Sequence, residues 1–163
     1  MKRIIIFLFL FVSLLFPAVH KHPEEKNNYG LCPVLAEPAS KEFSYEYKGK
    51  KYYFCCQDCV EKFKKAPETY ISRIKEIKVE AFQFGYLPEV IKVKKGDIVR
   101  IMLTTRDVPH GFMIKEYGID VKVKKGEKKE FEFLADKKGE FDIICSVYCG
   151  KNHSKMKGKL IVE

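Results

Sequence analysis

The stretch CSVYCGKNHSKM, residues 145–156, holds two cysteines four positions apart, then a histidine four positions on and a methionine three further. Two thiolates, an imidazole and a thioether form a soft donor set, which suits copper far better than magnesium or calcium. A mononuclear blue-copper loop uses a single cysteine. Cys145 and Cys149 together therefore supply enough sulfur to bridge a pair of metal ions.

The sequence around this loop predicts strands. Short alternating apolar runs are separated by turns rich in Gly, Asp and Lys, with no helical period between them. The runs cover residues 77–84, 90–93, 98–103, 112–114, 121–123, 131–133, 141–144 and 160–162. Strands of this length and spacing indicate a mainly β domain, a Greek-key β-sandwich over residues 77–163.

The loop resembles that of the CuA domains of cytochrome c oxidase subunit II and nitrous-oxide reductase, and the likeness extends over about residues 77–163. A second segment, DVPHGF at 107–112, is similar to the one that supplies a further histidine in that family. The resemblance implies a cupredoxin domain with a binuclear, electron-transferring copper centre. It implies six ligands, with Cys145 and Cys149 as bridging thiolates, His110, His153 and Met156 as terminal ligands, and Val147 through its backbone carbonyl.

Simpler interpretations exist for each residue alone. Cys145 and Cys149 can form a disulfide, His110 can be a hydrogen-bonded core residue, and Met156 can serve in packing. Two departures from the oxidase pattern also stand out: Val147 replaces the usual Glu, and the chain contains no Trp to accept electrons from cytochrome c. Both argue against an ordinary oxidase subunit. The domain is expected to transfer electrons and not to be an enzyme by itself.

A second group of cysteines precedes the predicted sandwich. Residues 29–74 combine Cys32, Cys55, Cys56 and Cys59 with a predicted hairpin (43–54), a helix (58–65) and a last helical turn to about residue 74. This α+β pattern looks like a YHS or TRASH domain, a small metal-binding module. The resemblance implies ligands Cys32, Cys55 and Cys59, with Cys56 a weaker candidate. Cu(I) is our preferred metal, while zinc or a disulfide would also stabilise so small a fold.

The N-terminal residues have the order of an export signal, with basic residues before an apolar run. Met1-Lys2-Arg3 precedes an apolar run over residues 4–16, which reaches only about 20 Å as a helix and falls short of a bilayer core. We predict a cleaved signal peptide over residues 1–18, or an anchor if it is uncleaved, followed by a flexible leader at 19–28. The protein is then exported, to the periplasm or the outer face of the cytoplasmic membrane.

The charge pattern bears on partners. The net charge is +9, but the basic residues are spread along the chain without an aromatic-interleaved stripe, so nucleic-acid binding is not expected. Three functions remain open: a redox carrier to or from a cytochrome or a terminal reductase or oxidase; a copper-handling protein whose first module binds Cu(I) and loads the cupredoxin site; and a divergent oxidase subunit. The second would involve a copper-delivery partner.

Overall fold

The computed structural model describes residues 29–163. The predicted signal segment (1–18) and leader (19–28) therefore lie outside the described residues. Among residues 29–163, no helix combines the length and apolar character that crossing a bilayer requires. Strands dominate, and two separate hydrophobic cores form, one in the cysteine-rich N-terminal part and one in the β-sandwich.

The N-terminal module pairs a hairpin with two short helices. Strands β1 (Ser40–Tyr47) and β2 (Lys50–Phe54) run antiparallel, and helices α1 (Gln57–Lys65) and α2 (Pro67–Ile71) follow. Lys48 and Gly49 both have positive φ, the geometry of a tight type I′ turn. Phe63 is fully buried on α1, and it contacts the five rings of Tyr45, Tyr47, Tyr52, Phe54 and Tyr70. These contacts fix α1 against the hairpin.

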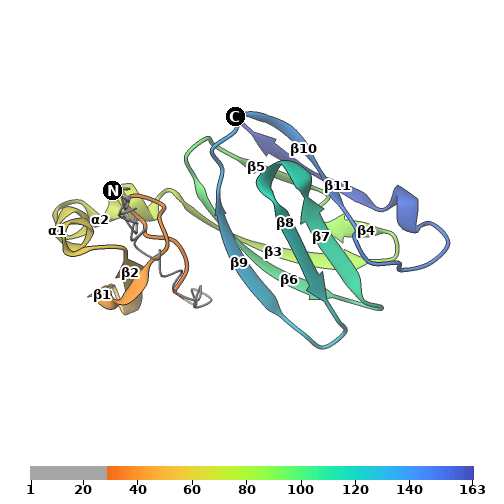
Figure 1. Cartoon of the computed structure of the whole chain (residues 1–163), viewed down its shortest axis with the longest axis horizontal. Coiled ribbons are helices and arrows are strands. Elements are labelled where there is room, and N and C mark those ends of the chain that lie inside the picture. The colour runs from red at the N-terminus through yellow and green to blue at the C-terminus, as the bar shows by residue number, and fades with distance from the viewer. Residues whose placement is uncertain (1–28) are drawn as a thin grey trace, which may run out of the picture.

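The rest of the chain is a two-sheet sandwich, as predicted (Figure 1). One sheet has the order β5-β11-β10-β7-β8 and the other the order β4-β3-β6-β9. The strands are β3 (Ile74–Phe82), β4 (Gly85–Leu87), β5 (Val90–Val93), β6 (Ile98–Thr105), β7 (His110–Ile114), β8 (Ile119–Val123), β9 (Lys129–Leu134), β10 (Gly139–Ile144) and β11 (Lys157–Val162). A short 3-10 turn, η1 (Lys115–Tyr117), joins β7 to β8.

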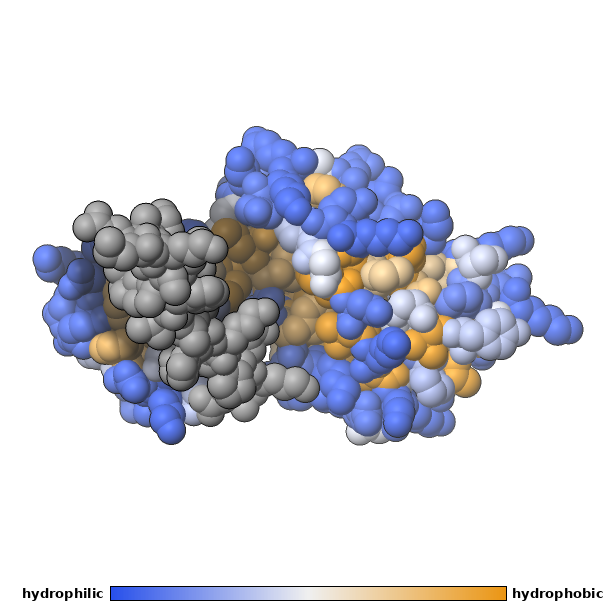
Figure 2. Space-filling model, in the orientation of Figure 1, coloured by the Kyte–Doolittle hydropathy of each residue, from blue (hydrophilic) through white to orange (hydrophobic). Residues whose placement is uncertain are grey.

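Alternating burial along the strands builds the core between the sheets. In β6, for example, Val99, Ile101 and Leu103 are completely buried. Figure 2 shows hydrophilic residues around the rim of the sandwich and hydrophobic ones toward the middle of the visible face. Burial that alternates along each strand matches the period of two that the sequence displays, so the mainly β fold is confirmed.

Two local predictions were wrong. The helix after Pro67 ends at Ile71, and residues 74–76, which lie before the predicted sandwich, belong to β3. The reason is that β3 pairs in parallel with β6 from Ile74 onward, a long-range contact invisible in the local sequence. Strand β4 was not predicted at all, since its three residues are too few to display a period.

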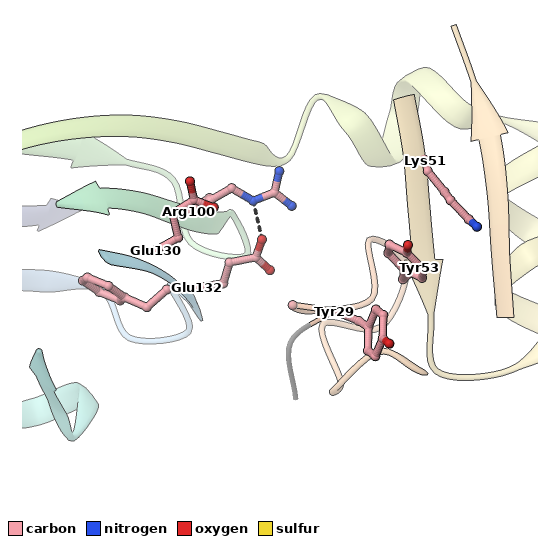
Figure 3. Close-up of a pocket in the computed structure, with 8 residues that line it drawn as sticks. Tyr29, Lys51, Tyr53, Arg100, Glu130 and Glu132 are labelled. Carbon is pink, nitrogen blue, oxygen red and sulfur yellow. Dashed lines mark hydrogen bonds and ion pairs between the residues drawn. The ribbon is translucent and has the colours of Figure 1, made fainter. Parts of the chain in front are cut away.

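The two parts of the chain meet through a polar network, of which Figure 3 shows the Arg100–Glu132 pair. The Glu132 carboxylate accepts a hydrogen bond of 2.7 Å from the backbone N–H of Leu31 and pairs with Arg100. Glu76 in turn binds both Arg100 (2.7 Å) and Lys50 (2.5 Å). A cavity of about 370 Å³ lies beside the network. Leu31 and Lys50 come from the module and the other three from the sandwich, so these contacts attach one to the other.

Strand β3 lies between the two cysteine groups. Ile74, at its start, packs on the core of the N-terminal module, whereas Gln83, just past its end, bonds to the backbone of Cys149. Nine steps of about 3.3 Å give roughly 30 Å between these ends. Figure 1 likewise shows the module at one end of the sandwich and the β10–β11 loop at the other.

Candidate metal centre

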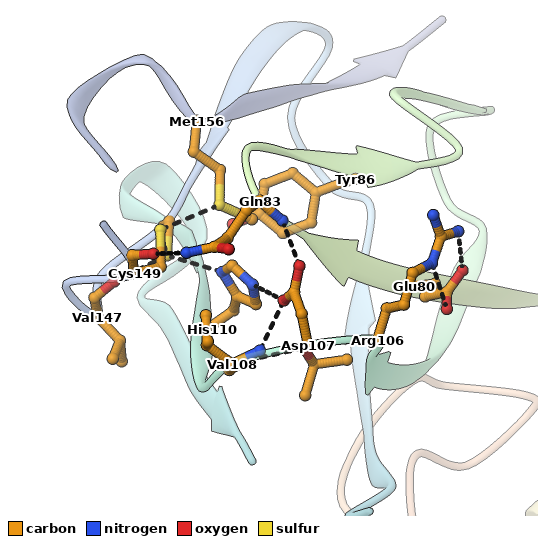
Figure 4. Close-up of polar contacts among 12 residues, drawn as sticks. Glu80, Gln83, Tyr86, Arg106, Asp107, Val108, His110, Val147, Cys149 and Met156 are labelled. Carbon is orange, nitrogen blue, oxygen red and sulfur yellow. Dashed lines mark hydrogen bonds and ion pairs between the residues drawn. The ribbon is translucent and has the colours of Figure 1, made fainter. Parts of the chain in front are cut away.

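The predicted copper loop is held at both ends by neighbouring strands. Cys145 directly follows β10 and Met156 directly precedes β11, and these two strands pair antiparallel up to the rung Ile144–Lys157. Within the loop, a 3-10 turn, η2 (His153–Lys155), carries the histidine. Because the sheet closes the base of the loop, its side chains gather in a small volume (Figure 4).

Two sulfur atoms lie at the centre of the predicted ligand set. The Sγ atoms of Cys145 and Cys149 are 3.9 Å apart, well beyond the length of about 2.05 Å of a disulfide bond. Cys149 Sγ lies 3.6 Å from His153 Nδ1 and 3.7 Å from Met156 Sδ. Cys145 Sγ lies 3.1 Å from the carbonyl oxygen of Val147. Three of the other four predicted donors thus lie around this one sulfur pair.

The remaining predicted ligand, His110, reaches the same point from the start of β7. It is fully buried, and its Nδ1 lies 3.7 Å from Cys145 Sγ. Its Nε2 lies 2.8 Å from Asp107 Oδ1, and Asp107 also accepts bonds from the N–H groups of Gln83 and Val108. A carboxylate on one ring nitrogen fixes the tautomer, leaving the other nitrogen as a lone-pair donor. Nδ1 is thereby directed at the cysteines.

The backbone beside the sulfurs is equally constrained. The N–H of Gly111 points at Cys145 Sγ over 3.4 Å, and its carbonyl accepts a 2.6 Å bond from the buried hydroxyl of Tyr86. A Cβ at position 111 would lie 2.0 Å from Ser146 Oγ. Only glycine therefore allows β7 to approach the loop this closely.

Three residues that support the site were not predicted, namely Asp107, Gln83 and Tyr86. Gln83 donates to the backbone carbonyl of Cys149 from 66 residues away, so no local pattern marks it. Asp107 could have been found from its place three positions before His110, a spacing at which a carboxylate can reach the imidazole.

The donor set fits copper. Burial, followed by the charge of neighbouring Cys145, raises the pKa of the Cys149 thiol to about 11. A bound soft cation would displace that proton and compensate the buried thiolate charge. Among the described residues, the group His110, Cys145 and Cys149 has its donor atoms within 4.8 Å of one another. Imidazole, thiolate and thioether at one point are ligands that copper prefers.

A solvent-accessible hollow of about 450 Å³ lies beside the loop. Its lining residues are Lys115, Glu116, Asp142, Ile144, Cys145, His153, Ser154, Met156 and Lys157. The ring of Tyr148, 76% exposed, lies 5.8 Å from that of His153. Among the predicted side-chain ligands, His153 alone is partly exposed, whereas the other four are buried.

The N-terminal cysteines form a second group. The Sγ atoms of Cys32, Cys55 and Cys59 lie within 4.8 Å of one another, while Cys56 Sγ is 3.4 Å from Cys59 and 3.9 Å from Cys55. All four thiols are free in the structure. Burial raises the pKa of Cys55 to about 11 and that of Cys59 further, whereas the backbone N–H of Cys59 lowers the pKa of Cys56. The predicted fourth cysteine is therefore adjacent to the other three.

Comparison with known families agrees with both parts of the chain. Residues 62–162 match the family model for the cupredoxin-like domain. The chain belongs to the cupredoxin-like family. Residues 32–74 match the YHS domain, so the cupredoxin-like chain also carries the small module that its cysteines predict.

Its relatives include a cytochrome c oxidase subunit and a nitrous-oxide reductase. The chain is 39% identical over 85 residues to cytochrome c oxidase subunit 2 of Thermus thermophilus, covering 52% of this chain and 63% of that protein. It is 40% identical over 83 residues to nitrous-oxide reductase of Ralstonia nicotianae, covering 48% of this chain and 13% of that protein. The match thus spans less than two thirds of each of these relatives.

Solved structures give the same fold. A haem-copper terminal oxidase dimer studied by cryo-EM superposes with a TM-score of 0.51 at 28% identity, over 55% of this chain and 65% of that one. The periplasmic domain of cytochrome oxidase subunit II from Bradyrhizobium japonicum superposes with a TM-score of 0.50 at 23% identity, over 55% and 83%. The relatives, the cupredoxin fold and the His-Cys group together support copper binding.

Proposed function

We propose that this is an exported copper protein whose second domain holds a binuclear CuA-type centre and transfers electrons. The observation that carries this proposal is the convergence of the other four predicted donors on the Cys145–Cys149 sulfur pair. A pair of bridging thiolates explains why the loop has two cysteines where one suffices for a single copper ion. A bound copper pair would supply a one-electron carrier.

The surroundings of the donors favour electron transfer over bond chemistry. Cys145, Cys149, Met156 and His110 are all at least nine-tenths buried, and the loop is closed by paired strands. A frame of this kind holds its ligands in one geometry. Little rearrangement then accompanies a change of oxidation state, which is what a fast carrier needs.

The redox partner is expected to dock near His153. The loop carries the exposed residues Lys151 and Lys155 and, over residues 145–158, no Asp or Glu. A basic rim steers an acidic partner toward the loop by long-range attraction. We therefore propose an acidic redox protein, such as a cytochrome or a component of a terminal reductase or oxidase, in the periplasm or at the outer membrane face.

Expression with copper, followed by metal counting and an optical spectrum, tests this proposal. Two copper ions in the second domain with a purple mixed-valence spectrum would support it. The count is best made in a chain with Cys32, Cys55 and Cys59 replaced by Ser, so that the first module contributes none. One copper ion with a blue spectrum, or a Cys145–Cys149 disulfide in the copper-treated protein, would refute the binuclear centre.

Copper handling is the second candidate, and the cluster of four thiols in the YHS domain favours it. Soft thiolates select Cu(I) over harder ions. Strand β3, roughly 30 Å long, lies between the cluster and the loop of the same chain, however, so we expect no direct transfer within one chain. In this structure, loading of the second domain by the first would have to occur between chains.

A further inference from the structure

The four thiols of the YHS domain form two triangles that share an edge. The inner triangle is Cys32, Cys55 and Cys59, with all Sγ atoms within 4.8 Å of one another. The outer triangle is Cys55, Cys56 and Cys59, with Sγ separations of 3.9, 3.4 and 3.6 Å. Cys56 lies outside the inner group, so the Cys55–Cys59 edge is common to two three-sulfur sites.

Burial orders the two triangles from the surface inward. Cys32 and Cys59 are fully buried, whereas Cys55 and Cys56 are partly exposed. Cys32 is held in a tight turn, since its N–H donates to Glu37 O and its carbonyl accepts from Ala36 N–H, both at 2.8 Å. The inner triangle thus has a fixed, buried corner, and the outer triangle has its own corner at the surface.

The local fold explains why Cys56 takes this position. It is the N-cap of α1, and Cys59 lies three positions on, in the first turn of the helix. Residues three apart lie on the same face of a helix, which brings the two sulfurs together. Its sulfur faces the first turn of the helix, beside the backbone N–H of Cys59 and the thiols of Cys55 and Cys59.

We propose that Cys56 is a transfer ligand through which a soft monovalent metal ion, Cu(I), enters and leaves the buried site. The inference rests on the copper-handling candidate above. Cu(I) arrives from a partner on the outer triangle and moves to the inner one while the Cys55 and Cys59 thiolates stay bound. One Cu–S bond, to Cys56, breaks as another, to Cys32, forms. The Cys32 thiol releases a proton to solvent, the Cys56 thiolate takes one up, and copper keeps its oxidation state.

The ion's coordination chemistry favours Cu(I) over zinc in this role. Structural zinc is held by four ligands at once in a tetrahedron. Cu(I) is stable with two or three thiolates and exchanges them one at a time. Two three-sulfur sites with a common edge suit stepwise exchange, because copper never falls below two sulfur ligands.

The test uses the full chain with Cys145→Ser and Cys149→Ser, which removes the thiolates of the second domain. In this background Cys56→Ser is compared with Cys32→Ser, and Gln57→Ser serves as an exposed control without sulfur. Ser is a preferred N-cap, so the Cys56 variant should keep α1. Each protein is titrated with Cu(I), and the chelator bathocuproine disulfonate then reports both the affinity and the rate of copper removal.

We expect Cys56→Ser to bind Cu(I) about as tightly as its parent but to release it to the chelator about tenfold more slowly, a barrier increase of about 1.4 kcal/mol. Cys32→Ser should bind more weakly and release no more slowly. An unchanged release rate in Cys56→Ser would overturn the transfer role. An affinity loss as large as that of Cys32→Ser would make Cys56 a permanent ligand instead. If the parent bound no Cu(I), the copper-handling function would be refuted, and the transfer role of Cys56 would be refuted with it.

Discussion

Replacing Asp107 by Asn tests how the buried histidine is prepared for copper. The carboxylate accepts bonds from Gln83 N–H (2.8 Å) on one oxygen, and on the other from Val108 N–H (2.7 Å) and His110 Nε2 (2.8 Å). Asn has only one oxygen. Its amide nitrogen must oppose either Gln83 N–H or the other two groups. In the second case the His110 proton moves to Nδ1, the nitrogen that faces Cys145.

The size of the effect follows from these contacts. A buried donor left without an acceptor costs about 1–3 kcal/mol. Loss of the outer partner of a metal-binding histidine lowers metal affinity by about 10–100-fold. The two estimates agree, since tenfold corresponds to about 1.4 kcal/mol. Asp107→Asn should therefore bind copper in the second domain about 10–100-fold more weakly while keeping the fold.

Chelator competition on the full chain, with Cys32, Cys55 and Cys59 replaced by Ser in every protein, measures this affinity. Asp120→Asn is the matched control, because Asp120 is exposed and accepts a bond from Ser146 Oγ without contacting an imidazole. Equal copper affinity in Asp107→Asn and its parent would refute the reasoning. So would an equal loss in the control, which would indicate a general charge effect.

Three further substitutions address the loop itself. Cys149→Ser should abolish the binuclear centre by removing a bridge, and retention of two copper ions with the same spectrum would refute bridging. Val147→Ala should leave the spectrum unchanged, because only its carbonyl oxygen lies near Cys145; copper loss would mean that this ligand is misassigned. Met156→Leu should keep both copper ions but change the reduction potential measured by redox titration, and an unchanged potential would exclude Met156 as a ligand.

Much of the second domain could be predicted because its signals are local. Strands show a period of two over a few residues, and five of the six predicted donors fall within residues 145–156. The contacts that position those donors are different. Gln83 and Tyr86 reach the site across 66 and 25 residues, respectively, and only the folded sheets bring them there. Candidate donors could therefore be chosen from the local sequence, whereas the polar contacts around them could not be predicted from it.

The same contrast applies to the junction between the two domains. The composition change near residue 77 indicates two units, but the parallel pairing of Ile74 with Ile98 places the boundary residues inside a sheet. Glu132, which joins the module to the sandwich through Leu31, has no sequence signal, because its partner is 101 residues away. A short flexible linker would have allowed contact between the two cysteine groups, whereas a shared strand separates them.

This separation leads to a last prediction, on how the second domain acquires copper. If the module supplies Cu(I), we expect the donor and acceptor sites to belong to different chains, since β3, roughly 30 Å long, lies between them within one. A donor chain with Cys145→Ser and Cys149→Ser, loaded with Cu(I), is mixed with a copper-free acceptor chain in which Cys32, Cys55 and Cys59 are Ser. Distinct affinity tags allow separation and copper counting.

The transfer rate should increase in proportion to the concentration of the acceptor, because the step is bimolecular. The unmutated chain, given one Cu(I) on its module, should likewise fill its second domain faster at higher protein concentration. A filling rate in the unmutated chain that did not change with concentration would mean that copper passes within one molecule. The module would then have to leave the arrangement that Glu132, Arg100 and Glu76 hold together.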